Sequence, residues 1–399
     1  MRVLITDFLA ESDCEREVLP GVEVDALLSL IGHPPTPADL VRSVGERPAA
    51  VLITWYEMFF DATTLAALSR AGVVGIVRAG VGFDNIDLVG ARAAGITVCN
   101  VPDYGTDEVA DHAMALLLWC LRCLRDASPT AASHGLPASQ NIRCRNALWL
   151  MKQAEEAGHP ISMREAGRRA KVSHAAIQHY QQAKARRLEQ GGLPEMPPTA
   201  APPTAWWDAA RFASILRLQE CTLGLLGFGR IGQATARRAQ SFGLNVRWYD
   251  PYVPRGQDKV TCTTRVENLP DLLQDCDALS IHCSLNHETR HMIDAAALAL
   301  LPPHAVVINT ARGPVIDEQA LFEALRAGRL AAAALDVLQH EPPVENALFD
   351  AYLRGELQNL LLTPHIAWYS QQSVRELRRK AAEEAGRLLR GEPPYNIVT

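Results

Sequence analysis

Three ionisable side chains each follow an apolar, strand-like segment of this sequence. Arg312 follows "VVINTA", Glu341 follows "AALDVLQH" and His365 follows "LLTP". Ligands of open parallel sheets bind beyond the carboxyl ends of the strands, so we expect the three side chains to meet at one site. Taken alone, a histidine after a proline is most often a loop residue, Arg312 could cap a helix, and Glu341 could lie in a solvated turn. Together they indicate a reactive centre.

The three residue types suit hydride transfer to or from an alcohol carbon. That reaction needs a base for the hydroxyl proton, and histidine exchanges protons near neutral pH. A carboxylate beside the imidazole fixes its tautomer and stabilises its cation. An arginine grips a substrate carboxylate through two hydrogen bonds and polarises the adjacent carbonyl. The set therefore predicts a 2-hydroxy or 2-oxo acid as substrate.

A dinucleotide site is predicted at "LGLLGFGRIGQA", which begins at Leu223. Gly227, Gly229 and Gly232 form GxGxxG between a strand and a helix, where glycines permit a tight turn and close approach of a pyrophosphate. Asp250 follows the next strand, eighteen residues past the last glycine, where a carboxylate favours NAD over NADP. Arg255 nearby leaves NADP open as an alternative.

Strands that alternate with helices position these residues in two predicted parallel sheets. The segments "RVLITD", "AAVLITW", "GVVGIVRAG" and "ITVCNV" predict strands of the first sheet, and a long helix is expected from about Thr106 to Arg125. Beyond residue 222, the segments "TLGLLG", "LNVRWYD", "DALSIHC", "AVVINTA", "LAAAALDVL" and "NLLLTPH" predict the second sheet. A last amphipathic helix is expected at about Gln371 to Leu389. The fold class is α/β with two doubly wound sheets.

Composition sets broad limits on the class of protein. The 399 residues carry a net charge of −6, 48% hydrophobic residues and 21% charged residues, which is ordinary for a globular protein with two to three domains. No targeting segment is recognised, and the apolar helix "AMALLLWCLRCL" is interrupted by Arg122, so no membrane span is expected. The nine cysteines form no metal set and indicate a reducing compartment, so we expect a cytoplasmic protein.

At these motifs the chain resembles the D-isomer-specific 2-hydroxyacid dehydrogenase family. The resemblance rests on "VRAGVGFDNIDL", "GLLGFGRIG", "INTARGPVID", "LDVLQHEPP" and "TPHIAWYS", and it covers about residues 1–125 and 205–399. Within the family, "VCNVPDYGTDEVAD" and "TPHIAWYSQQS" look most like the C-terminal-binding-protein branch. The resemblance implies NAD as cofactor and a homodimer formed through the NAD domains.

The resemblance also implies a role for each matching residue. His365 would be the acid/base, Glu341 its partner, and Arg312 the anchor of the substrate. Further substrate contacts would come from Val81, Gly82, Tyr104, Tyr56 and Trp368. Cofactor contacts would come from Gly227, Gly229, Arg230, Ile231, Gly232, Asp250, Thr106, Cys283, Thr310 and Asp336.

The implied domains are a flavodoxin-like substrate domain (1–105 plus 366–399) and a Rossmann NAD domain (106–126 plus 206–365). An insertion at 127–205 separates the two parts of the latter. Its helical patch, about 140–190, holds ten Lys and Arg but four Asp and Glu. The stretch "SMREAGRRAKVSHAAIQHY" resembles a helix-turn-helix, although a helical hairpin with a solvated basic face also explains it.

Two functions are therefore carried forward. The first is an NAD-dependent dehydrogenase of a small D-2-hydroxy acid. The second is a regulator that senses NAD and binds DNA or a protein partner through the insertion. The complete set of Arg312, Glu341 and His365 favours the enzyme, because binding alone would not require it.

Overall fold

The computed structural model describes residues 1–124, 162 and 215–399. Contacts between the Cα atoms divide the chain into two compact units. The larger unit comprises residues 1–117, 217–348 and 359–399 and contains both sheets of the fold. The helix-turn-helix-like stretch, and the segment "GGLPEMPPTAAPPTA" (191–205) that its prolines indicate to be a semi-rigid linker, belong to the insertion at 127–205 and lie outside the described residues, apart from Ser162.

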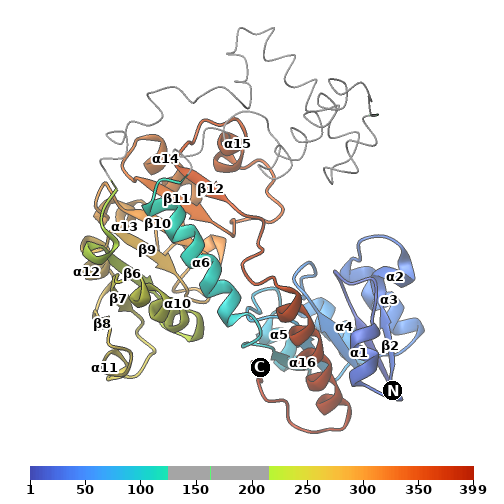
Figure 1. The fold of residues 1–399 in the computed structure, drawn as a ribbon. Coiled ribbons are helices and arrows are strands. Elements are labelled where there is room, and N and C mark those ends of the chain that lie inside the picture. Colours follow the sequence, from blue (N-terminus) through green and yellow to red (C-terminus); the bar gives the residue numbers. More distant parts are fainter. Residues whose placement is uncertain (125–161, 163–214) are drawn as a thin grey trace. The chain divides into compact units, whose positions relative to one another are not determined.

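The first sheet has five parallel strands in the order β2-β1-β3-β4-β5, which is the flavodoxin-like order. Three of its strands are buried along their whole length, as expected for a parallel sheet covered by helices on both faces. Figure 1 shows the strands and helices of this region in blue and cyan. The elements are β1 (Arg2–Ile5), α1 (Asp13–Val18), β2 (Glu23–Ala26), α2 (Leu27–Ile31), α3 (Pro37–Glu46), β3 (Val51–Thr54), α4 (Ala62–Arg70), β4 (Gly75–Arg78), α5 (Leu88–Ala93), β5 (Thr97–Asn100) and α6 (Thr106–Leu121).

The second sheet has seven parallel strands in the order β12-β11-β10-β9-β6-β7-β8. The strand order switches between β6 and β9: β7 and β8 follow on one side of β6, and β9 to β12 follow on the other. Doubly wound sheets bind ligands at this switch point. The elements from residue 215 onward are η3 (Leu218–Glu220), β6 (Thr222–Leu226), α10 (Arg230–Ser241), β7 (Asn245–Tyr249), α11 (Gln257–Thr261), β8 (Thr264–Arg265), α12 (Leu269–Gln274), β9 (Ala278–Ile281), α13 (Ala295–Leu300), β10 (Val306–Asn309), η4 (Gly313–Val315), α14 (Glu318–Arg326), β11 (Ala332–Leu335), α15 (Ala347–Leu353), β12 (Leu360–Leu362) and α16 (Gln371–Leu389).

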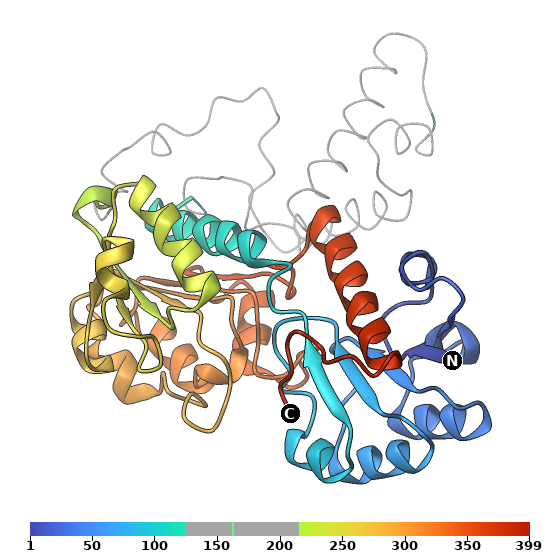
Figure 2. The same cartoon turned by 90° about the horizontal axis from the view of Figure 1, so that it is seen from below.

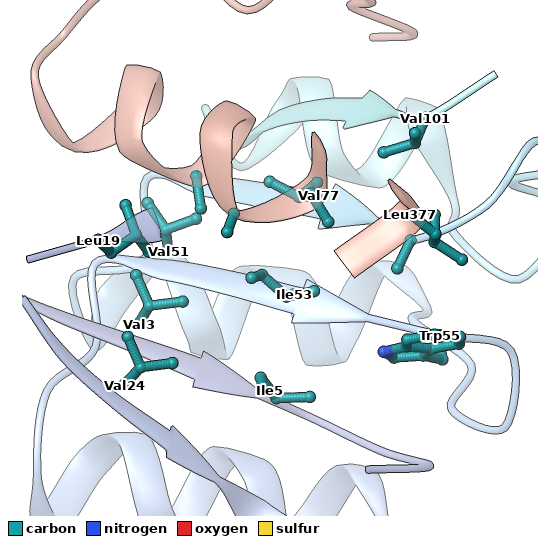
Figure 3. Packing of buried hydrophobic residues seen from close by; sticks show 14 of the residues in the cluster. Val3, Ile5, Leu19, Val24, Val51, Ile53, Trp55, Val77, Val101 and Leu377 are labelled. Atoms are coloured by element: carbon teal, nitrogen blue, oxygen red, sulfur yellow. The ribbon is translucent and has the colours of Figure 1, made fainter. Parts of the chain in front are cut away.

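Helix α16, the last helix of the chain, covers one face of the first sheet. Leu377, Ala381 and Ala385 pack against β1, β3 and β4 in one hydrophobic core (Figure 3). A capping box formed by Ser370 and Ser373 starts the helix. The chain after α16 returns beside β5, where Ile397 bridges Cys99 (Figure 2). Residues from both ends of the sequence thus complete one core.

The expected elements are largely confirmed. All ten predicted strands are present, and α16 spans the predicted residues. The sequence analysis missed two edge strands, β2 and β8, because two of the four residues of "EVDA" are charged and β8 has only two residues. Helix α6 ends at Leu121, before the expected Arg125. Among the described residues, no helix is long and apolar enough to cross a membrane.

Candidate active site

The glycine turn after β6 is shaped by close backbone contacts. Gly227 has φ +94°, and a Cβ there would lie 2.6 Å from the amide nitrogen of Cys283. A Cβ on Gly232 would lie 2.3 Å from the carbonyl oxygen of Gly227. Neither position accepts a side chain, because backbone atoms cannot move aside cheaply.

Gly229, between those two positions, faces open space instead. It is the N-cap of α10, no side chain caps the helix, and a Cβ there would meet nothing within 4 Å. The amides of the first helical turn can therefore receive a phosphate, which the helix dipole favours. Arg230, the first residue of α10, is exposed beside them.

Asp250 lies beside this turn, just after β7. One carboxylate oxygen accepts the backbone N–H of Phe228 at 2.8 Å, and the other accepts the N–H of Tyr252 at 2.9 Å. These two bonds fix the carboxylate next to the glycine turn. Its remaining acceptor capacity suits a ribose diol, and its charge opposes a 2′-phosphate.

His365 and Glu341 form a hydrogen-bonded pair. Nδ1 of His365 lies 2.6 Å from Oε2 of Glu341, and the other carboxylate oxygen accepts the N–H of Leu338 at 2.8 Å. Because a carboxylate only accepts, Nδ1 carries the proton and Nε2 is left for proton exchange. Each side chain is 30% exposed, so the pair remains accessible.

Asp336 fixes the segment that carries His365. Its carboxylate accepts the Thr363 hydroxyl at 2.5 Å and the N–H groups of Ile366 and Ala367 at 3.0 and 2.8 Å. Its backbone carbonyl accepts the N–H of His365, which has the left-handed φ of +53°. A buried carboxylate thus holds the histidine in a backbone conformation that L-residues seldom adopt.

Arg312 is held by a carboxylate from the first sheet's loops. Its Nε donates to Asp84 at 2.9 Å, and Nη1 donates to the carbonyl of Ala311 at 2.8 Å. Burial on its own would raise the pKa of Asp84, but the Arg312 guanidinium lowers it below its ordinary value. Asp84 is therefore ionised and aligns the guanidinium.

One pocket in the larger unit brings most of the predicted residues together. Two of the three predicted catalytic residues, His365 and Arg312, line it. So do the predicted substrate contacts and four predicted cofactor contacts: Val81, Gly82, Tyr104, Tyr56, Trp368, Ile231, Cys283, Thr310 and Asp336. Tyr56 stacks on the His365 ring with centroids 6.0 Å apart.

The other predicted residues lie outside the lining of this pocket. Glu341 contacts it only through His365, and Thr106 is the first residue of α6. The three glycines, Arg230 and Asp250 belong to the turn and helix N-terminus described above. The assigned roles of all these residues remain predictions.

Among the lining residues that the sequence analysis missed, three have titratable side chains: Arg78, Asp84 and His282. Each was visible as a polar residue at or just beyond a buried strand, in "GIVRAG", "VGFDN" and "LSIHC". The principle that side chains beyond the carboxyl ends of parallel strands meet at one site, which predicted Arg312, Glu341 and His365, applies equally to these three residues.

Four lining residues of this pocket have a buried polar atom without a hydrogen-bond partner, and two of them, Thr310 through Oγ1 and His282 through Nδ1, belong to the second-sheet side. Burial lowers the pKa of His282 to about 4, so the ring is neutral, and burial raises the pKa of the neighbouring Cys283 thiol to about 12. Buried polar groups usually have a hydrogen-bond partner, so these two atoms are free to bind a ligand in the pocket. With the open face at Gly229, they fit a dinucleotide. The described residues contain no cluster of His, Cys, Asp and Glu that could hold a metal ion.

Comparison with known proteins identifies the family. Residues 201–367 match the family model "D-isomer specific 2-hydroxyacid dehydrogenase, NAD binding domain". The chain is 30% identical over 324 residues to the glyoxylate reductase of Thermococcus litoralis, covering 81% of this chain and 76% of that protein. It is also 30% identical over its whole length to the D-3-phosphoglycerate dehydrogenase of Methanocaldococcus jannaschii, of which it spans 59%.

A solved structure, the TT0316 protein from Thermus thermophilus, is similar over 100% of both chains, with 27% identity and a TM-score of 0.67. The chain belongs to the D-isomer-specific 2-hydroxyacid dehydrogenase family. Its cofactor is NAD, and the residues that match the NAD-binding domain of the family include the second sheet. The finer placement in the C-terminal-binding-protein branch stays a prediction.

Proposed function

We propose that this protein is an NAD-dependent oxidoreductase that interconverts a small D-2-hydroxy acid and its 2-oxo acid. The observation that carries the proposal is that His365, which lines the same pocket as Arg312, is held at 2.6 Å by Glu341. The relatives named above are a glyoxylate reductase and a D-3-phosphoglycerate dehydrogenase, whose names both imply 2-hydroxy acid chemistry.

His365 acts as the acid/base through Nε2, since Nδ1 is engaged by Glu341. In the reductive direction the imidazolium donates this proton to the substrate oxygen, and in the oxidative direction the neutral ring accepts it. Glu341 stabilises the imidazolium and fixes its tautomer. Arg312 binds the carboxylate and polarises the adjacent carbonyl, helped by the amides of Val81 and Gly82. When bound, NAD supplies the acceptor or donor of the hydride.

The test is a screen followed by one substitution. NADH oxidation is measured with a panel of 2-oxo acids that includes glyoxylate, pyruvate and branched-chain and aromatic members. His365→Ala is then expected to lower kcat for the best substrate about 1,000-fold, since general acid/base groups contribute about 10²- to 10⁴-fold. Binding of NADH, followed by fluorescence, is expected to stay unchanged. Undiminished turnover in this variant would overturn the proposed mechanism.

We also propose two features of organisation. Residues 1–105 with 366–399 form the substrate domain, which the packing of α16 on the first sheet supports. The NAD domain then comprises 106–126 with 206–365. A homodimer through the NAD domains is supported by the family resemblance alone, and light scattering of the purified chain tests it.

A further inference from the structure

Helix α6 presents two rows of polar side chains, each spaced four residues apart, to different parts of the larger unit. The row of Asp107 and Asp111 accepts hydrogen bonds from Arg238 of α10. The row of Glu108 and His112 lies one residue further round the helix. Nothing in the proposed mechanism uses this second row.

The second row holds both ends of the segment that carries His365. Glu108 accepts the hydroxyl hydrogen of Ser370, the N-cap of α16, at 2.7 Å. His112 lies against the start of the segment, with Nε2 3.1 Å from the hydroxyl oxygen of Thr363. The segment is thus attached to one face of α6 at both ends.

The direction of the bond between His112 and Thr363 follows from their neighbours. The Thr363 hydroxyl has a single hydrogen, which it donates to Oδ1 of Asp336 at 2.5 Å. Its oxygen can therefore only accept from His112, so Nε2 of His112 carries a proton. The same nitrogen lies 3.6 Å from Oδ1 of Asp336. His112 is thus a donor to the pair of Thr363 and Asp336.

Asp336 transmits this contact to the backbone of the proposed acid/base. Its carboxylate accepts the N–H groups of Ile366 and Ala367, and its carbonyl oxygen accepts the N–H of His365. The Asp336 side chain is 1% exposed, and a buried carboxylate is costly unless it is hydrogen-bonded and paired. Among the described residues, the only basic side chain paired with Asp336 is His112.

His365 depends on this support because its backbone has the left-handed φ of +53°, which must be maintained by its neighbours. Glu341 fixes the ring at Nδ1 but does not hold the backbone. The backbone is held by Trp368, whose Nε1 donates to the carbonyl of His365 at 2.9 Å, and by Asp336. Loss of the donor to Asp336 would therefore loosen one of two backbone supports.

We propose that His112 is a positioning residue whose Nε2–H holds Thr363 and Asp336 so that His365 presents its own Nε2 to the substrate oxygen. This inference rests on the proposed function, because it takes His365 as the acid/base. His112 is not among the residues that line the pocket, so its effect on the reaction passes through Asp336. Proton transfer requires hydrogen-bond geometry, so a small displacement of His365 slows it.

The role predicts a change in kcat rather than in KM. Arg312 keeps its bond to Asp84, and the turn at Val81 keeps its bond to Asn100, so binding of the carboxylate should be retained. Slower proton transfer limits turnover more strongly, so the solvent isotope effect on kcat, measured in heavy water, should increase. A smaller folded fraction would lower the apparent kcat without changing this isotope effect.

The kinetic test compares His112→Leu, which removes the donor, with His112→Gln, whose amide nitrogen can take the place of Nε2. Leucine and glutamine both suit a helix interior. In His112→Leu, kcat on the best 2-oxo acid is expected to fall about tenfold, as for loss of a hydrogen bond to a buried group, while KM and the Kd of NADH change less than about threefold. In His112→Gln, kcat should stay within about threefold of the unmodified protein.

Amide hydrogen exchange of the free protein gives a second readout, which needs no turnover. The amides of Ile366 and Ala367, which donate to Asp336, should exchange about tenfold faster in His112→Leu but not in His112→Gln. The amides of β10, in the middle of the second sheet, report global unfolding and serve as the internal reference.

His304→Leu is the matched control. His304 also contacts a carboxylate, that of Asp277, at 2.7 Å, but neither residue lines the pocket. This variant is expected to leave kcat, the solvent isotope effect and the exchange of Ile366 and Ala367 unchanged.

An unchanged kcat in His112→Leu overturns the inference, and so does a failure of His112→Gln to restore it. If His112→Leu does not fold, His112→Asn, whose amide is too short to reach Thr363, takes its place under the same criteria. Absence of turnover by the unmodified protein would instead contradict the proposed function. The exchange comparison would then still decide whether His112 holds the segment.

Discussion

Two glycine-containing turns, at residues 79–82 after β4 and 227–232 after β6, solve the same problem differently. Both follow a buried parallel strand, and both need glycine because other atoms approach the backbone closely. The second turn leads directly into α10, whose uncapped amides face open space. The first turn has no helix until α5 begins at Leu88, and the guanidinium groups of Arg78 and Arg312 pack against it instead.

The difference reflects the anion that each turn is proposed to receive. A pyrophosphate is large and doubly charged, so several backbone amides and the partial charge of a helix N-terminus suffice. A carboxylate is small, and its orientation determines which face of the adjacent carbon reacts. Arginines supply a full charge and directed pairs of hydrogen bonds. The dinucleotide turn is therefore built from backbone, and the proposed substrate turn from side chains.

Gly82→Ala tests the side-chain turn and should have the largest effect of the variants that distinguish the two turns. The new Cβ would lie 1.6 Å from Nη2 of Arg312, so the guanidinium must move. We expect kcat/KM to fall about 100-fold, as for loss of a preorganised charged donor. The fold should be retained, because a flexible side-chain end can move aside. Steady-state kinetics and thermal unfolding measure both effects, and unchanged kcat/KM would contradict the placement of Arg312.

Gly229→Ala tests the backbone turn. Its φ of −73° suits alanine and its Cβ would meet nothing within 4 Å, so the melting temperature should stay the same or rise slightly. The methyl group would occupy space next to the amides of α10, and the Kd of NADH should rise about tenfold. Gly232→Ala is the contrasting variant, because its Cβ meets backbone and should destabilise the fold as well. Unaltered NADH binding in Gly229→Ala would place the dinucleotide elsewhere.

Asp250→Asn should have the smallest effect of the three. The amide oxygen can still accept the N–H of Phe228, so the turn is maintained, while the negative charge beside the ribose site is lost. The ratio of kcat/KM for NADH over NADPH should fall by up to about tenfold. Parallel assays with the two cofactors measure this ratio. A preference for NADH that persists in the variant would mean that Asp250 does not select the cofactor.

The sequence predicted most of the fold because the central strands are buried on both faces. Segments such as "VVI" in β10 and "VLI" in β3 are continuous apolar runs, whereas β2 and β8 at the sheet edges carry no comparable signal. The GxGxxG turn was predictable because Gly227 and Gly232 have steric causes that hold wherever a strand leads into a helix in this way, and Gly229 leaves the helix amides open. The shared pocket of Arg312 and His365 was predictable because parallel strands end at one edge.

The balance of charges in the pocket could not be predicted from the sequence. Whether an arginine is paired depends on contacts across long separations, such as that of Arg312 with Asp84 or of Arg378 with Glu15. Arg78 lies within a motif that the sequence analysis quoted, but that its Nε lacks a hydrogen-bond partner among the described residues appears only when its neighbours are known. For the same reason, the role of Asp336 in holding the His365 segment was not foreseen.

The position of α16 has a consequence for synthesis of the protein. The strands of the first sheet are translated long before Leu377, Ala381 and Ala385, which cover one of their faces. Until then Val3, Val51 and Ile53 lack their apolar cover (Figure 3). The nascent first sheet should therefore be a chaperone substrate until α16 has been translated, and changes that hinder the packing of α16 should impair the yield of the folded chain.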